Sequence, residues 1–290
     1  MRQLFVSIII GLWATLPTTA QVTYQPSAAL VTYQPSDSVR ICRLLQQAPA
    51  DATTLWFARQ FLGIPYVAHT LEVNDREQLV VNTRQLDCTT LVETVVALTL
   101  CVRHGERSWQ GYTRRLEQLR YRGGRCEGYP SRLHYFSDWI ADNAARGLVS
   151  EVQGPNPPFS AVQQLKLDFM STHPQSYKSL KAHPEQVAVI RQQEQQLTGQ
   201  RFRYIPKSAV RNTRPLRQTV HDGDIIAITC NKAGLDIAHL GFAVWRSDGL
   251  HLLNASQLHK RVVEEPMTFR RYLQKHPSHT GIRVIKLNHQ

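Results

Sequence analysis

Cys88 has the residue type and the local context of a catalytic nucleophile. It follows Asp87, precedes Thr89 and Thr90, and opens an apolar stretch over residues 91–100 that has helical spacing. A thiol at a helix N-terminus faces unpaired backbone N–H groups and the positive end of the helix dipole, and both favour the nucleophilic thiolate. A cysteine in an apolar helix is more commonly a packing residue. A catalytic function for Cys88 therefore depends on whether the chain also supplies a histidine as its base.

A histidine and an asparagine further along the chain can complete such a site. His239 precedes a strand-like apolar run over residues 240–245, and Asn254 lies near the end of a second run over 250–256. The Ser-Asp-Gly turn at 247–249 joins the two runs as a hairpin. Antiparallel pairing would place the imidazole beside the asparagine amide, which can fix its orientation. The sequence therefore predicts a Cys–His–Asn site.

The order of elements predicts how these residues are positioned. Helical patterns precede a strand meander, which indicates an α+β fold rather than alternating βαβ units. The expected helices cover residues 38–46, 53–62, 184–197 and the stretch that begins at 88, and the expected strands cover 79–82, 224–229, 240–245, 250–256 and 281–285. We expect one domain over 40–290, enlarged by an insertion of loops and helices at roughly 104–215.

The first 39 residues are expected to lie outside this domain. Arg2, the apolar run over 4–16 and the small residues at 18–20 are typical of a signal peptide over 1–20. The run is shorter than the ~20 residues of a membrane-spanning helix, although an uncleaved anchor is the alternative. Residues 21–39 contain a duplicated VTYQPS motif and are expected to form a flexible leader.

Charge and cysteine content narrow the class of protein. The formal net charge of +12 suits acidic polymers such as cell-wall glycans and their peptide carboxylates, and no nucleic-acid module is recognisable. We expect an exported protein, periplasmic or extracellular, that is a monomer. Five cysteines are an odd number, so at least one thiol should stay free. The sequence does not decide whether the others are buried thiols or form a bridge such as Cys101–Cys126.

Several segments carry a resemblance to a known superfamily. The chain resembles the NlpC-type papain-like cell-wall hydrolases in ordered landmarks at 63–66 (GIPY), 87–90 (DCTT), 223–226 (GDII), 239–243 (HLGFA) and 254–256 (NAS). It more closely resembles their N-acetylmuramoyl-L-alanine amidase-like branch, formerly a bacterial domain of unknown function, at 87–93 (DCTTLVE), 131–135 (SRLHY) and 234–239 (GLDIAH). The resemblance spans about residues 40–287.

The resemblance implies a papain-like NlpC-type fold, with the nucleophile at a helix start packed on an antiparallel sheet. It also implies cleavage of the amide between N-acetylmuramic acid and L-alanine, on small muropeptides that include anhydro-muramyl ones. Cys88 then matches the nucleophile, His239 the general base and Asn254 the third residue. Tyr66 matches an active-site tyrosine, which could join the backbone N–H groups that hold the oxyanion. No cofactor and no metal are expected.

Substrate binding requires groups that recognise sugar rings and carboxylates. Arg132, Tyr135 and Trp139 are candidates because a guanidinium suits carboxylates and aromatic faces suit sugars. A helix that packs these aromatic residues inward is the alternative interpretation. Asn82 and Arg84, just before the cysteine, are weaker candidates for the same cleft.

Four alternatives stay open. His259 competes with the asparagine as the third residue if the strand register differs. A γ-D-glutamyl stem-peptide endopeptidase of the same superfamily would use the same catalytic residues on another bond. A zinc amidase could take its ligands from His221, Asp222, Asp236 and His239, although no HExxH-type pairing occurs. A wall-binding protein without activity is the non-enzymatic alternative.

Overall fold

The structure, a computed structural model, describes residues 31–154 and 158–288. The expected signal peptide and the first copy of the repeat lie outside the described residues. The leader expected up to residue 39 instead joins the fold from residue 31: strand β1 (Val31–Thr32) pairs in parallel with β2 (Leu79–Val80), and helix α1 (Pro35–Gln47) follows. This segment is held in the fold by Asp37 of α1, whose fully buried carboxylate accepts hydrogen bonds from the Thr83 N–H and hydroxyl at 2.9 and 2.8 Å.

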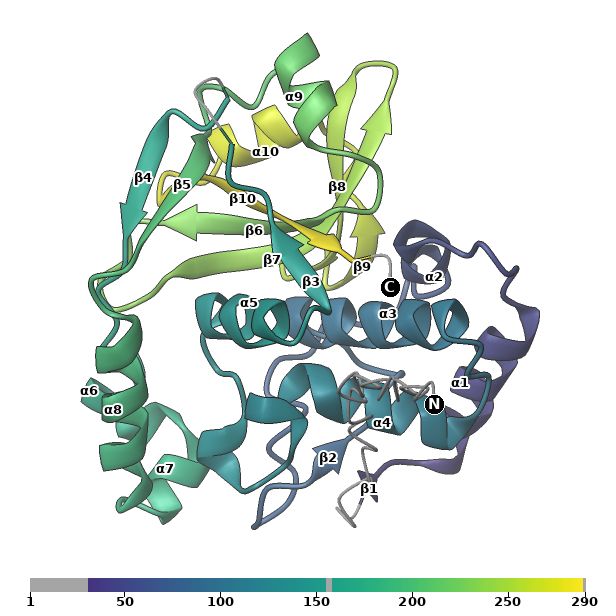
Figure 1. Ribbon diagram of the computed structural model, residues 1–290, viewed down its shortest axis with the longest axis vertical. Coiled ribbons are helices and arrows are strands. Elements are labelled where there is room, and N and C mark those ends of the chain that lie inside the picture. The colour runs from purple at the N-terminus through teal and green to yellow at the C-terminus, as the bar shows by residue number, and fades with distance from the viewer. Residues whose placement is uncertain (1–30, 155–157, 289–290) are drawn as a thin grey trace, which may run out of the picture.

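The first half of the chain is mainly helical. After α1 come α2 (Thr54–Arg59), α3 (Cys88–Arg103), α4 (Trp109–Arg120), the 3-10 turns η1 (Arg122–Gly124) and η2 (Tyr129–Ser131), and α5 (Phe136–Ala145). Helix α3 is central, and its residues 90–102 are all buried. A helix that is apolar on all sides requires cover on all sides. Figure 1 shows α3 and α5 running beneath the sheet, with α4 further from it.

The second half builds an antiparallel sheet. Its strands are β3 (Val149–Glu151), β4 (Ala161–Gln164), β5 (Arg201–Pro206), β6 (Ile225–Cys230), β7 (Ile237–Arg246), β8 (Gly249–Ser256), β9 (Arg261–Glu264) and β10 (His279–Leu287). They lie in the order β4-β5-β10-β6-β7-β8-β9, with β3 also paired to β10, and every pair is antiparallel. This arrangement confirms the expected α+β fold with an antiparallel sheet.

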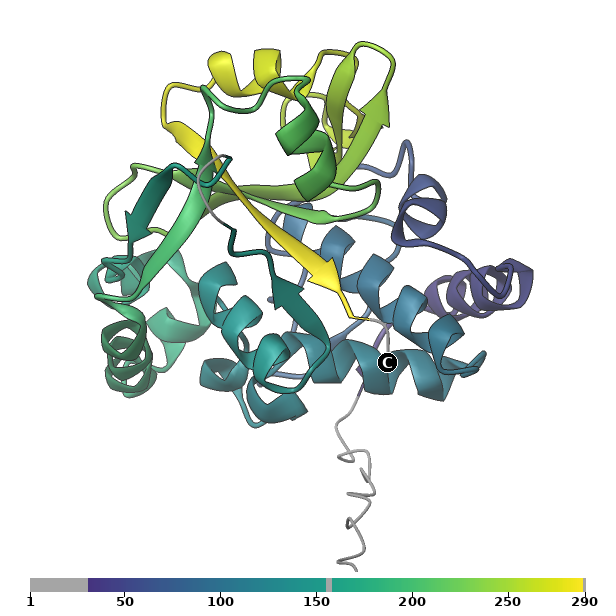
Figure 2. The same cartoon turned by 45° about the horizontal axis from the view of Figure 1, so that its top comes forward.

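Both faces of this sheet are covered, as strand β6 shows. Ile225 and Ala227 pack into the core shared with the helical half. Ile226 and Ile228 pack into a second core with α9 (Arg214–Thr219) and α10 (Phe269–Gln274). Burial on both faces explains why β6 is a continuous apolar run rather than an alternating one. Figure 2 shows α9 and α10 on the side of the sheet away from α3.

The middle segment is more integral to the fold than a loop-rich insertion. Its strands β3 and β5 pair with β10, and α4 and α5 contribute to the main core. Only the short helices α6 (Phe169–Thr172), α7 (Lys178–Ala182) and α8 (Gln186–Leu197), with the 3-10 turn η3 (Pro174–Ser176), form a separate lobe around a small third core. The polar composition of this middle segment therefore reflects short helices and strands rather than an absence of secondary structure.

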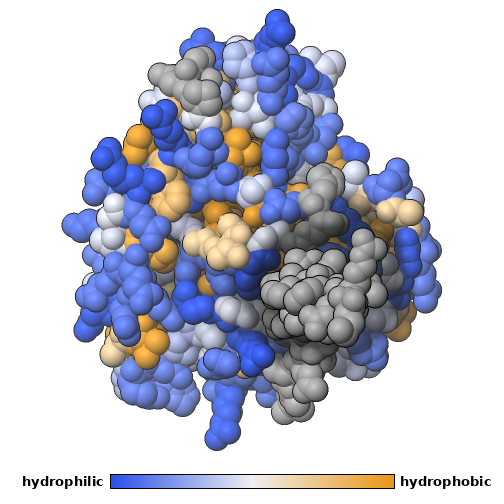
Figure 3. All heavy atoms as spheres, in the orientation of Figure 1, coloured by the Kyte–Doolittle hydropathy of each residue, from blue (hydrophilic) through white to orange (hydrophobic). Residues whose placement is uncertain are grey.

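The surface and the thiols complete the description. The face in Figure 3 is mostly hydrophilic, with hydrophobic side chains scattered over it. Within the described ranges, no helix combines the length and apolar character that crossing a membrane requires. All five cysteines are free thiols, so Cys101 and Cys126 do not form the bridge considered above.

Candidate active site

Cys88 is the first residue of α3, and a capping box fixes its position. The Asp87 carboxylate accepts a hydrogen bond from the Thr90 N–H at 2.8 Å, and the Thr90 hydroxyl accepts one from the Asp87 N–H at 2.9 Å. This reciprocal pair satisfies two backbone donors at the helix start. The helix packs against β7 and β8, so the thiol lies at the seam between the helical half and the sheet.

The hairpin formed by β7 and β8 brings the predicted histidine and asparagine together. Pairing of Phe242 with Leu253 sets the register, and beyond it His239 Nε2 lies 2.9 Å from Asn254 Oδ1. Asn254 is fully buried, whereas His239 is half-buried and lines the same cavity of about 170 Å³ as Cys88. The structure thus gathers the three residues expected to form the site.

A buried carboxylate behind Asn254 was not found from the sequence. The Asn254 amide nitrogen donates to Glu265 Oε1 at 3.2 Å, and His259 Nε2 lies 3.1 Å from Glu265 Oε2. Because a carboxylate accepts hydrogen bonds, it turns the amide nitrogen inward and the amide oxygen toward His239. The imidazole Nε2–H then donates to that oxygen, and Nδ1 keeps its lone pair. His259, the competing third residue, therefore contacts the glutamate rather than His239.

The resting charge state of the site differs from the expected thiolate. Burial, reinforced by the negative charge of Asp87, raises the pKa of the Cys88 thiol to about 12, although the Leu240 N–H and Thr89 donate to the sulfur and favour the thiolate. Burial also lowers the pKa of His239 below its ordinary value. The position at a helix start is thus outweighed by desolvation, and both groups rest in their neutral forms.

Two phenols lie close enough to the thiol to interact with its charge. Burial and the neighbouring Cys88 and Asp87 raise the pKa of Tyr66 to about 12. Burial, with Glu265 and Cys88, raises the pKa of Tyr272 as well. Both hydroxyls therefore stay protonated at neutral pH and can donate hydrogen bonds to an anion. Tyr272, on α10, was missed from the sequence because no strand or helix had been expected between residues 257 and 280.

Comparison with known proteins identifies the family of this chain. Residues 56–282 match the model of the N-acetylmuramoyl-L-alanine amidase-like family. The chain belongs to this family. The match covers the helix that carries Cys88 and the hairpin that carries His239 and Asn254, and it confirms the resemblance read from the sequence motifs.

Solved structures agree with the family in fold. The chain is similar to an N-acetylmuramoyl-L-alanine amidase from Bacteroides uniformis, with 40% identity over 81% of this chain and 97% of that chain and a TM-score of 0.75. It is also similar to a Bacteroides fragilis protein described as a candidate xylanase, with 41% identity over 79% and 99% of the two chains and a TM-score of 0.73. A Legionella pneumophila protein shares the fold at 22% identity, 87% and 93% coverage and a TM-score of 0.65. No curated protein matches the sequence.

Among the expected substrate-binding residues, only Tyr135 lines the cavity beside Cys88. Its hydroxyl donates to Glu194 Oε1 at 2.7 Å, so the ring rather than the hydroxyl is presented to the cavity. Trp139 is fully buried and stacks on Phe136 at 4.8 Å, so it packs inward and cannot contact a substrate.

The three other expected binding residues also have structural partners away from that cavity. Arg132 lies between Glu72 and Glu77 and over the Tyr129 ring, where it lines a separate cavity of about 160 Å³. Arg84 pairs with the buried Asp37 carboxylate at 3.3 Å. The Asn82 side-chain oxygen accepts hydrogen bonds from the next backbone N–H groups, at 3.0 and 3.1 Å, and so shapes the loop before α3.

The four candidate zinc ligands do not converge. Asp236 accepts a hydrogen bond from the Ser137 N–H at 2.7 Å, and His239 pairs with Asn254. His221 lies beside Lys286 Nζ at 3.1 Å, and the Asp222 carboxylate accepts a hydrogen bond from the Trp245 N–H at 2.6 Å. Over residues 31–154 and 158–288 no group of three or more His, Cys, Asp or Glu side chains is placed to hold a metal ion.

Proposed function

We propose that this protein hydrolyses the amide between N-acetylmuramic acid and L-alanine, on small muropeptides that include anhydro-muramyl ones. Membership of the family supports a hydrolase that acts on the cell wall. The amidase from Bacteroides uniformis supports the scissile bond. The observation that carries the cysteine mechanism is a half-buried thiol and a half-buried imidazole on the wall of one cavity, with the imidazole hydrogen-bonded to Asn254.

The first half of the reaction transfers the acyl group to sulfur. Because the thiol and imidazole rest neutral, His239 Nδ1 takes the Cys88 proton as the sulfur attacks the lactyl carbonyl carbon. The carbonyl oxygen gains the negative charge, and the Cys88 N–H at the start of α3, with the Tyr66 hydroxyl, would hold it. The imidazolium then gives its proton to the nitrogen of L-alanine, the C–N bond breaks, and the peptide leaves as a free amine.

The second half returns the enzyme to its starting state. His239 takes a proton from water, and the hydroxide attacks the thioester carbon. The C–S bond breaks, the sulfur recovers the proton from His239, and the lactyl group leaves as a carboxylic acid. Throughout, Asn254 holds the ring by its Nε2–H. A neutral amide can orient an imidazolium but not neutralise it, and the Glu265 carboxylate behind it would supply the compensating charge.

Glycosidase chemistry is less well supported by this cavity. Cleavage of a glycosidic bond requires two carboxyl groups on either side of it. Of the described residues that line the cavity with Cys88, only Asp236 carries a carboxylate, and the Ser137 N–H occupies it. The γ-D-glutamyl endopeptidase stays the competing proposal, since the same three residues could cut within the stem peptide.

Defined muropeptides and mass spectrometry separate these functions. The wild type should release free peptides that begin with L-alanine, and Cys88→Ala should lose activity while keeping its thermal unfolding profile. Activity should survive EDTA. Release of L-alanine still attached to the sugar would support the endopeptidase, and inhibition by EDTA would support a zinc enzyme.

A further inference from the structure

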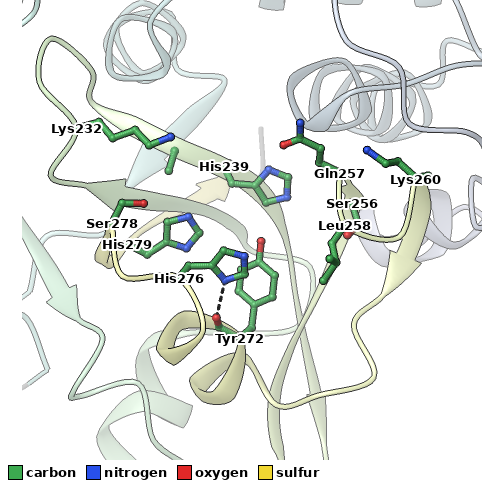
Figure 4. Close-up of a pocket in the computed structure, with 11 residues that line it drawn as sticks. Lys232, His239, Ser256, Gln257, Leu258, Lys260, Tyr272, His276, Ser278 and His279 are labelled. Atoms are coloured by element: carbon green, nitrogen blue, oxygen red, sulfur yellow. Dashed lines mark hydrogen bonds between the residues drawn. The ribbon is translucent and has the colours of Figure 1, made fainter.

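A larger cavity opens on the other side of His239. Its volume is about 430 Å³, and it reaches from the imidazole toward α10 and the start of β10. Tyr272, whose phenol interacts with the Cys88 charge, also lines it. Figure 4 shows Tyr272, His276 and His279 on one side of this cavity, with His239 above them and Gln257 and Lys260 opposite. The scissile bond at Cys88 would therefore have this cavity on one side and the smaller one on the other.

The two cavities differ in charge. The lining of the larger one includes Lys232, Lys260 and three histidines, and no Asp or Glu is among its described residues. No carboxylate lies within ion-pair distance of either lysine in the part of the chain that the structure describes. The smaller cavity is lined largely by aromatic and apolar side chains, namely Tyr135, Phe136, Met170, Tyr177 and Leu235.

A buried polar atom in the larger cavity has no partner. His279 is only 7% exposed, and its Nδ1 makes no hydrogen bond within the described residues. The His279 ring stacks on His276 at 4.7 Å, and Nδ1 of His276 donates to the Tyr272 carbonyl oxygen at 2.7 Å. An unsatisfied buried polar atom costs stability, so a site built around one is suited to a ligand that completes it. An N–H at this position would donate to an oxygen of that ligand.

We infer that this cavity binds the carboxylates of the stem peptide, with Lys232 and His279 as specificity-determining residues. The inference rests on the proposed function and deepens it. In that substrate the lactyl carboxyl is consumed by the amide and the N-acetylated sugar is neutral, so the negative charge lies on the peptide. A cavity with unpaired lysines and an unsatisfied imidazole fits the peptide side, and the aromatic cavity fits the sugar side.

A matched substrate pair tests this assignment. N-acetylmuramoyl-L-alanyl-D-glutamate carries an α-carboxylate that is a carboxamide in the D-isoglutamine counterpart. The wild type should have a kcat/KM about tenfold higher for the diacid, which is the size of one hydrogen bond to a charged group. In Lys232→Met and in His279→Phe the ratio of kcat/KM for the diacid to kcat/KM for the carboxamide should fall toward unity. Lys181→Met, an exposed lysine on α7 outside this cavity, should keep the wild-type preference.

Binding without catalysis keeps this test separate from the proposed function. Calorimetry with the Cys88→Ala protein should show tighter binding of L-alanyl-D-glutamate than of L-alanyl-D-isoglutamine, and Lys232→Met added to it should remove the difference. An unchanged preference in both Lys232→Met and His279→Phe overturns the inference even when the amide is cleaved. If the wild type cleaves neither substrate, the proposed function fails, and equal binding of the two dipeptides would then overturn this inference as well.

Discussion

At the scale of single residues, a chain of hydrogen bonds runs from the imidazole of His239 to a buried carboxylate. His239 contacts Asn254, Asn254 contacts Glu265, and Glu265 contacts His259. The glutamate is fully buried and lies behind the amide rather than beside the imidazole. Its charge also raises the pKa of His239, opposing the larger effect of burial. In the proposed mechanism we therefore expect Glu265 to be a positioning residue that fixes the amide and stabilises the imidazolium.

Replacing Glu265 by Gln should lower kcat by about ten- to a hundredfold, as loss of a partner behind a functional side chain does, with little change in KM. The acid limb of the pH–rate profile should also move to lower pH, because the charge that raises the pKa of His239 is gone. His259→Gln keeps the carboxylate and should leave that limb nearly in place. A loss of kcat in Glu265→Gln with an unmoved limb would show that the glutamate only orients the amide.

The pH dependence of the wild type follows from the neutral imidazole. Burial lowers the pKa of His239 below its ordinary value of 6.5, so the base should remain competent at pH values where an exposed histidine is half protonated. We expect kcat/KM to stay level down to about pH 6.5 and to fall at lower pH. Asn254→Ala removes a hydrogen bond that raises this pKa, so its acid limb should lie lower still. A wild-type limb above pH 6.5 would contradict a buried neutral base.

At the scale of elements, hydrophobic patterning and turn signals are sufficient to predict the helix and the strands that carry the proposed catalytic residues. The Ser-Asp-Gly turn and two apolar runs define the hairpin of β7 and β8, and that register alone brings His239 beside Asn254. The substrate-binding predictions depended on which way a helix faces. Trp139 lies on the inner face of α5, a property that tertiary packing decides and its own segment does not reveal.

The residues missed from the sequence lie on elements with weak local signals. Tyr272 lies on the six-residue helix α10, His276 lies in the turn after it, and His279 is the first residue of β10. The spacing His-x-x-His was visible, but its position beside His239 depends on β10 returning to pair with β6, a contact between strands almost fifty residues apart. Glu265 follows β9, whose pairing places it behind Asn254.

The capping box of α3 gives a prediction at this scale, because Asp87 both caps the helix and raises the pKa of Cys88. Asp87→Asn keeps a side-chain oxygen at the cap but removes the charge, so the thiol should react with iodoacetamide several-fold faster at about pH 9. Asp87→Ala should lose about 1 kcal/mol of unfolding free energy as well. Mass spectrometry of the Cys88 peptide follows the reaction apart from the other thiols. Equal rates in the wild type and Asp87→Asn would show that burial alone sets the thiol pKa.

At the scale of the whole molecule, the site occupies the seam between two halves that the chain order already separates. The proposed nucleophile comes from the helical half, and the proposed base and the amide that contacts it come from the sheet. The fully buried Arg283 on β10 links these halves, since it donates to Ser137 of α5 at 2.7 Å and to Glu151 of β3 at 2.8 Å. His239 lines both cavities, but only the smaller one lies on this seam, because Cys88 of the helical half lines it as well.

Three histidines that the fold holds neutral should make the folded protein sensitive to acid. Burial lowers the pKa of His239, of His134 to about 3 and of His279 to about 4. The unfolded chain takes up these protons near pH 6.5, whereas the folded protein does not. The contribution of these histidines to the unfolding free energy is therefore fully present above pH 6.5 and is lost as the pH falls toward 3. Each neutral histidine can contribute a slope of at most ~1.4 kcal/mol per pH unit. Urea unfolding between pH 7.5 and 4 measures the slope, and His134→Gln, which removes one titrating ring, should make it shallower. A wild-type free energy that stays constant between pH 6.5 and 4.5 would contradict histidines held neutral by the fold.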